Sequence, residues 1–155
     1  MSEEIRILID ADSCPVKEEV YKVALRHEVP VSIVANSYMN VSRSKLVELI
    51  VVSSEFDAAD DYIAEKATQT TVVVTADILL ADRCLKAEAT VIAPNGVLFT
   101  PNSIGGAIAT RAIMEDLRVG GEQHGGPPPF SKTDRSRFLS ALHDALLKLK
   151  RNKSG

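Results

Sequence analysis

The run Thr71-Val72-Val73-Val74-Thr75, in which every residue is β-branched, is the segment that most restricts the fold. Branching at Cβ favours extended backbone. An unbroken run of this kind is typical of a strand that is buried on both faces, and such strands belong to parallel sheets covered by helices. The run therefore favours an α/β fold.

Strand-like and helix-like segments alternate along the first 119 residues. Short β-rich apolar runs, which predict strands, occupy residues 5–9, 31–35, 46–52 and 91–93. Apolar residues at helical spacing, which predict helices, occupy residues 15–27, 57–68, 79–87 and 103–119. This alternation predicts an α/β domain at residues 1–119 with a largely parallel, doubly wound sheet of about five strands.

Local signals predict where two of the helices begin. Pro15 is suited to the first position of a helix, behind Asp12 and Ser13 as capping candidates. Residues 120–130 contain four Gly and three Pro, so residues 120–132 are expected to form a loop. Thr133 then caps a last helix, residues 133–150. We expect this helix to pack on the same domain, with packing on a second copy in a homo-oligomer as the alternative.

The composition excludes several classes of protein. The chain has 155 residues, of which 45% are hydrophobic and 25% charged, as in ordinary globular proteins. No apolar run approaches the roughly 20 residues of a membrane span, and the acidic start Met1-Ser2-Glu3-Glu4 shows no signal peptide. Cys14 and Cys84 form no Cys-x-x-Cys pattern. We expect a reduced, cytoplasmic protein without membrane association.

Charge is distributed unevenly along the chain. Residues 1–110 carry 9 Lys and Arg against 16 Asp and Glu, a balance of −7. Residues 111–155 carry 9 against 5, a balance of +4. An acidic body with a basic tail suits a site that holds cations and meets a polyanion, although a solvated basic helix explains the tail equally well.

Acidic residues follow two of the predicted strands. Asp10 and Asp12 come after the first strand and Asp77 after the fourth, while Asp82 lies one helical turn further on. The helix before the fourth strand opens with Asp57, Asp60 and Asp61. Ligands of open α/β sheets gather beyond the carboxyl ends of the strands, so these carboxylates can converge on one crevice.

A cluster of carboxylates without neutralising charges implies raised pKa values or bound cations. Oxygen ligands without His or Cys favour Mg²⁺ or Mn²⁺. Two such ions would activate a water and stabilise the leaving oxygen in phosphodiester cleavage. The alternative is structural: Asp12 caps a helix, and Asp57 and Asp61 are solvated first-turn acids. Asp10 is harder to explain in this way, because a carboxylate directly after an apolar strand needs a partner.

Several motifs in order resemble the YaiI/YqxD family of bacterial proteins. They are residues 9–17 (Ile-Asp-Ala-Asp-Ser-Cys-Pro-Val-Lys), 59–64 (Ala-Asp-Asp-Tyr-Ile-Ala), 74–81 (Val-Thr-Ala-Asp-Ile-Leu-Leu-Ala), 102–111, 125–130 and 134–138. The resemblance covers nearly the whole chain. Departures are mild: Thr70-Thr71 stands where the family usually has Gly-Asp, and Glu88 where Gly is common.

The resemblance extends to the PIN-like group of metal-dependent nucleases, which implies a three-layer α/β fold. In that group an Asp ends the first strand, another begins a D-x-x-I-A pattern, and a third completes T-x-D. Here these positions are Asp10, Asp60 and Asp77. The resemblance implies that these three are catalytic and coordinate Mg²⁺ or Mn²⁺, with Asp12 and Asp82 assisting.

Basic and polar residues supply candidate contacts to substrate. Arg111, Arg118 and Arg135, with Lys132 and Arg137, give the C-terminal third phosphate-binding potential. Asn36 at a strand end and Lys17 in a first helical turn are further candidates; the alternatives are a loop-capping Asn and a solvated Lys. Aromatic residues make up only 5% of the chain, so contact with a nucleic-acid backbone is favoured over base readout.

Three functions are consistent with these observations. The favoured one is a Mg²⁺- or Mn²⁺-dependent nuclease acting on RNA or another single-stranded nucleic acid. The second is a non-catalytic module that binds nucleic acid or protein, in which the acids only cap helices. The third is a phosphohydrolase of small substrates with Asp10 as nucleophile and Asp12 as general acid. Thr75 suits that third chemistry, but no Lys is convincingly placed for it.

Overall fold

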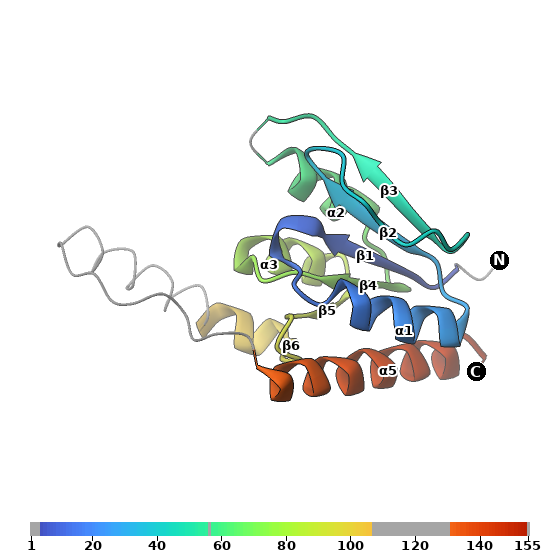
Figure 1. Ribbon diagram of the computed structural model, residues 1–155. Helices are drawn as coiled ribbons and strands as arrows, with labels where there is room; N and C mark the ends of the chain where they lie inside the picture. Colours follow the sequence, from blue (N-terminus) through green and yellow to red (C-terminus); the bar gives the residue numbers. More distant parts are fainter. Residues whose placement is uncertain (1–3, 56, 107–130, 155) are drawn as a thin grey trace.

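The computed structural model describes residues 4–55, 57–106 and 131–154, in which one sheet has helices on both faces (Figure 1). The strands are β1 (Arg6–Asp10), β2 (Val31–Ala35), β3 (Val47–Val51), β4 (Thr71–Val74), β5 (Thr90–Ile92) and β6 (Leu98–Phe99). The helices are the 3₁₀ turn η1 (Ala11–Ser13), α1 (Lys17–His27), α2 (Ala58–Lys66), α3 (Ile78–Lys86) and α5 (Lys132–Ser154), and residues 101–106 are also helical. Most of the predicted loop at 120–132 and most of the predicted helix at 103–119 lie outside the described residues. Lys132 already belongs to α5, so the last helix begins one residue before the predicted 133.

The strand order is β3-β2-β1-β4-β5-β6. Neighbouring strands are parallel along the row β3-β2-β1-β4-β5, and β6 pairs antiparallel with β5. The chain therefore winds outward from β1 in one direction and then crosses back to β4, so that the order reverses between these two strands. In open α/β sheets the crevice at this switch point is where ligands bind. The α/β prediction is confirmed, with six strands where about five were predicted.

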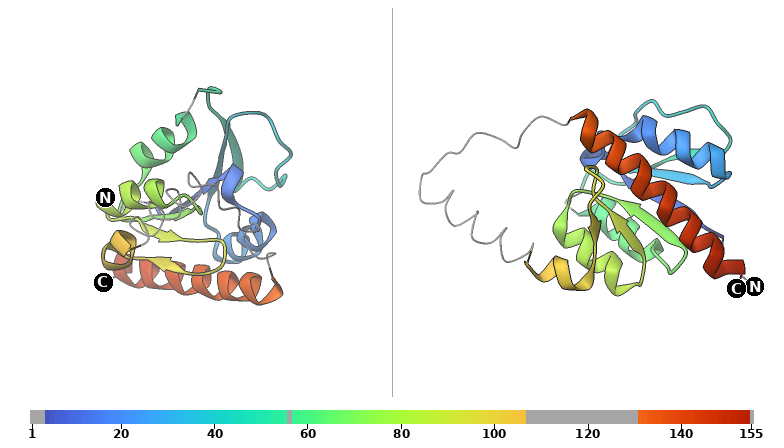
Figure 2. Two further views of the ribbon diagram at one scale, coloured as in Figure 1. Left: turned by 90° about the vertical axis from the view of Figure 1, so that its left-hand side faces the viewer. Right: turned by 90° about the horizontal axis from the view of Figure 1, so that it is seen from below.

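The sheet separates two apolar cores because side chains alternate between its faces. On β1, Ile7 and Ile9 face the core shared with α1 and α5, whereas Leu8 faces the core shared with α2 and α3. All three are at most 2% exposed. Figure 2 shows the resulting layers, with the sheet between the two helical faces. This layering explains why apolar residues occupy both faces of the central strands.

Helix α1 begins at Lys17 rather than at Pro15, so the predicted capping by Asp12 and Ser13 is wrong. Asp12 and Ser13 lie in η1, and Cys14 before the proline is extended. An extended conformation is the usual one for a residue that precedes proline, because the ring disfavours helical backbone there. Val16, fully buried, is the N-cap and supplies no side-chain bond.

Helix α5 is capped by Ser131 and not, as predicted, by Thr133. Ser131 Oγ accepts a hydrogen bond from the Asp134 amide at 3.0 Å, and Asp134 Oδ2 accepts one from the Ser131 amide at 3.1 Å. This reciprocal pair satisfies two amides that have no partner inside the helix. The acidic residue three positions after Ser131 is the sequence signal that favours it over Thr133.

Among the described residues, Glu28, Asp57, Glu88 and Gly96 have a positive φ, the left-handed backbone that favours glycine. Gly96, in the turn between β5 and β6, has φ 89°, and a Cβ placed there would lie 2.6 Å from the carbonyl carbon of Arg137. The missing side chain thus lets α5 approach this turn closely. Glu88, where the resemblance expects Gly, has φ 67°. Its carboxylate is exposed and accepts a hydrogen bond from Gln69 Nε2 at 2.7 Å.

Helix α5 lies beside α1 (Figure 2, right). Its buried side chains join the core formed by α1 and the sheet; they are Phe138, Leu142, Leu146 and Leu149. Across the described ranges, no helix combines the length and apolar character that would let it cross a membrane.

A polar chain of side chains also joins α1 to α5. Lys150 Nζ lies 3.0 Å from His27 Nδ1, and His27 Nε2 lies 2.9 Å from His143 Nδ1. Since an ammonium group can only donate, His27 accepts at Nδ1 and donates from Nε2 to His143. Burial lowers the pKa of His27, and the charges of Lys150, His143 and Arg26 lower it further. Protonated His27 would place a proton against the ammonium of Lys150.

We expect His27 to make folding stability dependent on pH. A histidine whose pKa is lowered by folding contributes stability that is present above its ordinary value of 6.5 and is lost as pH falls through that value. Urea unfolding of the wild-type protein and of His27→Gln at pH 5, 6, 7 and 8 isolates this contribution from other titrating groups. The wild-type free energy of unfolding should fall relative to that of the variant below about pH 6.5. A constant difference across this range would contradict the prediction.

Candidate functional site

Asp10 ends β1 at the switch point and is only 6% exposed. Its Oδ2 accepts a hydrogen bond from Thr75 Oγ1 at 2.9 Å, across the gap to the end of β4. Thr75 Oγ1 in turn accepts a hydrogen bond from the Asp77 amide at 3.0 Å. One buried hydroxyl therefore fixes the carboxylate of Asp10 and the backbone of Asp77 relative to each other.

Asp77 is held in place from a second direction because it is the N-cap of α3. Its Oδ1 accepts hydrogen bonds from the amides of Leu79 at 2.9 Å and Leu80 at 3.1 Å. These two amides would otherwise lack partners at the start of the helix. Oδ2 accepts no hydrogen bond from the part of the chain that the structure describes. Asp77 thus combines a structural role at one oxygen with an available second oxygen.

Asp60, in the first turn of α2, is half-buried, and folding raises its pKa from 3.8 to about 6. Burial is the largest cause, followed by the negative charges of Asp77, Asp10 and Asp57, and the positive charge of Arg83 opposes these effects. The acids of β1, α2 and the end of β4 therefore lie close enough for their negative charges to repel one another.

This repulsion has a consequence for stability. The folded chain holds the Asp60 proton more tightly than the unfolded chain does. Without a bound cation, the contribution of Asp60 to stability therefore decreases as pH rises from 3.8 to about 6. A divalent cation that bound these carboxylates would relieve the repulsion and compete with the proton.

The other predicted acids have different surroundings. Asp61 forms an ion pair of 2.9 Å with Arg83, and Asp82 forms one of 3.1 Å with Lys86 within α3. Asp12 lies in η1 and is exposed. Among the three acids that open α2, Asp60 is therefore the one that interacts with Asp10 and Asp77, while Asp61 faces α3.

The donor set suits a hard divalent cation in chemistry, although the carboxylates are not already arranged around one point. Among the described residues, no group of three or more His, Cys, Asp or Glu side chains is placed to hold a metal ion. Asp10, Asp60 and Asp77 offer only oxygen donors, which Mg²⁺ prefers. Mg²⁺ is commonly held by one or two carboxylates together with waters and substrate phosphates rather than by a complete protein cage.

Three of the predicted phosphate contacts instead donate hydrogen bonds to backbone carbonyls; they are Lys17, Asn36 and Arg135. Lys17 Nζ donates to the carbonyls of Ala11 at 3.1 Å and Cys14 at 2.9 Å. Arg135 donates to the carbonyl of Pro15 at 3.1 Å, and Asn36 Nδ2 donates to that of Ser53 at 2.9 Å. Arg111 and Arg118 lie outside the described residues. Two cations, from α1 and α5, thus hold the segment that follows Asp10.

Sequence reasoning missed two residues of this region. Thr75 was considered only for a phosphatase, although a hydroxyl at the end of a strand two residues before Asp77 is a signal for a bridging hydrogen bond. Glu19 gives no comparable signal. It is buried in α1 and pairs with Arg135 at 2.8 Å through Oε1, and its Oε2 lacks a hydrogen-bond partner among the described residues.

Comparisons with known proteins agree with the resemblance inferred from the motifs. The family model described as "Uncharacterized BCR, YaiI/YqxD family" matches residues 8–148. A UPF0178 protein of Sphingopyxis alaskensis is 64% identical over 146 residues, covering 94% of this chain and 95% of its own. A UPF0178 protein of Brucella ovis is 56% identical over 148 residues, covering 95% and 92%. No solved structure gives a significant match.

Proposed function

The chain belongs to the YaiI/YqxD family, and we propose that it is a Mg²⁺- or Mn²⁺-dependent nuclease that hydrolyses phosphodiester bonds in RNA or another single-stranded nucleic acid. The observation that carries the proposal is the arrangement at the switch point, where the Thr75 hydroxyl links the Asp10 carboxylate to the backbone of Asp77. The raised pKa of Asp60, caused by burial and by the charges of Asp77 and Asp10, supports it, because carboxyl groups with shifted pKa values are candidates for a functional site.

The three carboxylates differ in how firmly they are held. Asp10 is fixed by Thr75, and Asp77 by the amides of α3, so these two form the rigid part of the cation site. Asp60 enters from α2 and is the group whose protonation changes near neutral pH. Rigid elements that position two ligands allow the third to adjust when cation and phosphate bind.

A bound divalent cation supplies neutralisation of the phosphate charge and activation of a water for hydrolysis. Asp10, Asp60 and Asp77 are the residues that would hold the cation. Thr75 fixes the orientation of the Asp10 carboxylate, because its hydroxyl donates to Oδ2. Lys17 and Arg135 keep η1, which follows Asp10, from moving away from the site.

Calorimetric titration with Mn²⁺ tests the cation site directly. The wild-type protein is expected to bind Mn²⁺ saturably at pH 7.5 and more weakly at pH 5, because Asp60 with a pKa of about 6 is then protonated. Asp10→Asn should abolish binding while its amide oxygen still accepts the bond from Thr75. Asp61→Asn is the matched control, since Asp61 pairs with Arg83 and should leave binding unchanged.

The titration is followed by a cleavage screen on RNA and DNA single strands with Mn²⁺ or Mg²⁺. Cleavage that requires the cation and Asp10 supports the nuclease. Nucleic-acid binding without turnover under any divalent ion would favour a non-catalytic module instead. A phospho-aspartate trapped at Asp10 would favour the small-substrate phosphohydrolase.

A further inference from the structure

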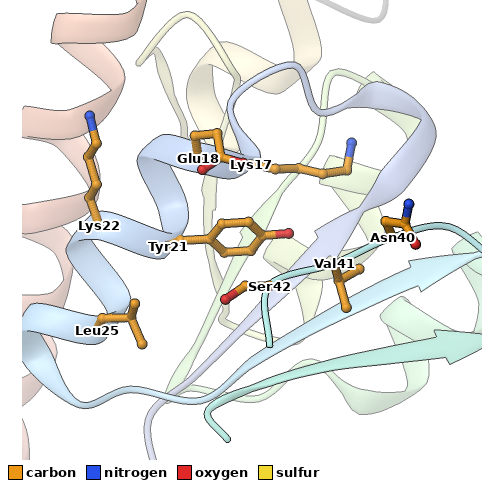
Figure 3. A pocket seen from close by; sticks show the side chains of 8 residues that line it. All are labelled: Lys17, Glu18, Tyr21, Lys22, Leu25, Asn40, Val41 and Ser42. Atoms are coloured by element: carbon orange, nitrogen blue, oxygen red, sulfur yellow. The ribbon is translucent and has the colours of Figure 1, made fainter. Parts of the chain in front are cut away.

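A pocket of about 530 Å³ lies between α1 and residues 36–46, the segment that connects β2 to β3 (Figure 3). Side chains from α1 line one side and side chains from residues 40–42 line the other. The hydroxyl of Tyr21 points across the pocket toward this segment (Figure 3). Its volume is within the range of about 300–1,000 Å³ that ligand sites occupy. We refer to it as the crossover pocket; its polar lining residues are Lys17, Glu18, Tyr21, Lys22, Asn40 and Ser42.

Positive charge gathers at the crossover pocket, lined by Lys17 and Lys22, and in residues 36–46 beside it, within an acidic part of the molecule. Residues 36–46 contain Arg43 and Lys45 and no Asp or Glu, although residues 1–110 as a whole have a balance of −7. Arg43 and Lys45 are exposed, as is Lys22 on the facing helix. Glu18 is the acid among the residues that line the pocket. A local excess of cations in an acidic body attracts a polyanion to this position.

An exposed aromatic side chain belongs to the same segment as Arg43 and Lys45. Tyr38 is 78% exposed, and its hydroxyl lies 3.5 Å from Oδ1 of Asn40, which lines the pocket. An aromatic ring so open to water has little role in packing. Stacking on nucleic-acid bases is the common use of such a ring next to a basic groove.

The crossover pocket also begins near the acidic site. Residue 36 directly follows the carboxyl end of β2, and β2 pairs with β1 so that Val34 lies opposite Asp10. Lys17 lines the pocket and bonds to the carbonyl of Ala11, the residue after Asp10. A strand bound in the pocket can therefore continue to the carboxylates at the switch point.

We propose that the crossover pocket, together with the exposed residues 36–46 beside it, binds single-stranded nucleic acid, with Tyr38 stacking on a base and Lys22 and Arg43 contacting phosphates. The proposal rests on the proposed function for the nature of the substrate. The carboxylates of Asp10, Asp60 and Asp77 repel a polyanion. The cations of the pocket and of residues 36–46 attract one, so they would supply the affinity for substrate that the acidic site does not. A duplex keeps its bases stacked inside, so the ring of Tyr38 selects single strands.

The test is binding of a fluorescent 12-nucleotide RNA single strand in EDTA, measured by anisotropy with the full chain, so that cation binding and cleavage play no part. Tyr38→Ala should weaken binding about tenfold, and Tyr38→Phe should retain it because the ring still stacks. Lys22→Ala and Arg43→Ala should each weaken binding and reduce its dependence on salt. Lys148→Ala on α5 and Leu98→Ala on β6, both at exposed positions, should leave it unchanged.

Failure of this inference is distinguishable from failure of the proposed function. If Mn²⁺-dependent cleavage is present but Tyr38→Ala binds RNA as tightly as the wild-type protein, the pocket proposal is overturned and the nuclease stands. If Tyr38→Ala loses RNA binding while the wild-type protein does not bind Mn²⁺, the pocket proposal stands and the nuclease fails. A wild-type protein that does not bind the single strand, or that binds a duplex more tightly, also overturns the pocket proposal.

Discussion

Asp77→Asn is expected to lower Mg²⁺- or Mn²⁺-dependent hydrolysis of single-stranded nucleic acid by about 10³-fold, because the cation loses one of its two firmly held carboxylates. Asn carries no charge and is a poor ligand for Mg²⁺. The measurement is the single-turnover cleavage rate of a labelled strand at saturating Mn²⁺. Calorimetry on the same samples should show that Mn²⁺ binding is lost as well.

The same variant should fold normally, since Asn is as good an N-cap as Asp. Its amide oxygen can accept from Leu79 and Leu80 as Oδ1 does now. Asp77→Ala is the contrasting variant: it removes the ligand and also the cap, so it should lose about 1 kcal/mol of stability in addition. Asp77→Asn protein that cleaves and binds Mn²⁺ like the wild type would remove Asp77 from the cation site.

Phe138→Ala is expected to lower the free energy of unfolding by about 3–5 kcal/mol, the usual cost of removing a buried aromatic side chain. Phe138 is fully buried and joins α5 to the core that contains α1 and one face of the sheet. Total stabilities of natural domains are about 5–15 kcal/mol, so this variant should be close to unfolding. Urea unfolding followed by circular dichroism gives the measurement.

Leu147→Ala is the matched control on the same helix, because Leu147 is 39% exposed and its truncation should cost little. If Phe138→Ala and Leu147→Ala were equally stable, α5 would not be docked as described. The Phe138→Ala substitution should also disturb the candidate site. Arg135, one turn earlier on α5, bonds to Pro15 and Glu19 beside η1.

Local sequence pattern was sufficient for the regular elements. The strand predicted at 31–35 matches β2 residue for residue, and those predicted at 5–9 and 71–75 differ from β1 and β4 by one residue. These predictions succeed because alternation and β-branching depend on neighbours in the chain. Strand β6 escaped prediction, since a two-residue strand exists only through its pairing with β5.

The helix starts show where local signals are insufficient. Asp12, Ser13 and Thr133 all have suitable side chains for capping, but none of them caps a helix. The start of α1 coincides with the burial of Val16 and with hydrogen bonds from Lys17 Nζ to the carbonyls of Ala11 in η1 and of Cys14 after it. The start of α5 depends on a reciprocal pair at Ser131 and Asp134. The start of α1 thus depends on tertiary burial, whereas the start of α5 is set by a local pair that the sequence itself signals.

For the candidate site, the sequence identifies the residues, and the tertiary structure determines their interactions. Asp10, Asp60 and Asp77 could be named from the sequence, because an acid after an apolar strand is conspicuous and the family motifs mark all three positions. Their individual states could not. Contacts between distant segments raise the pKa of Asp60, join Thr75 to Asp10 and turn Arg135 toward the chain after Asp10. Periodicity and composition are properties of neighbours in the chain, whereas charge interactions and burial depend on residues that meet only after the sheet has formed.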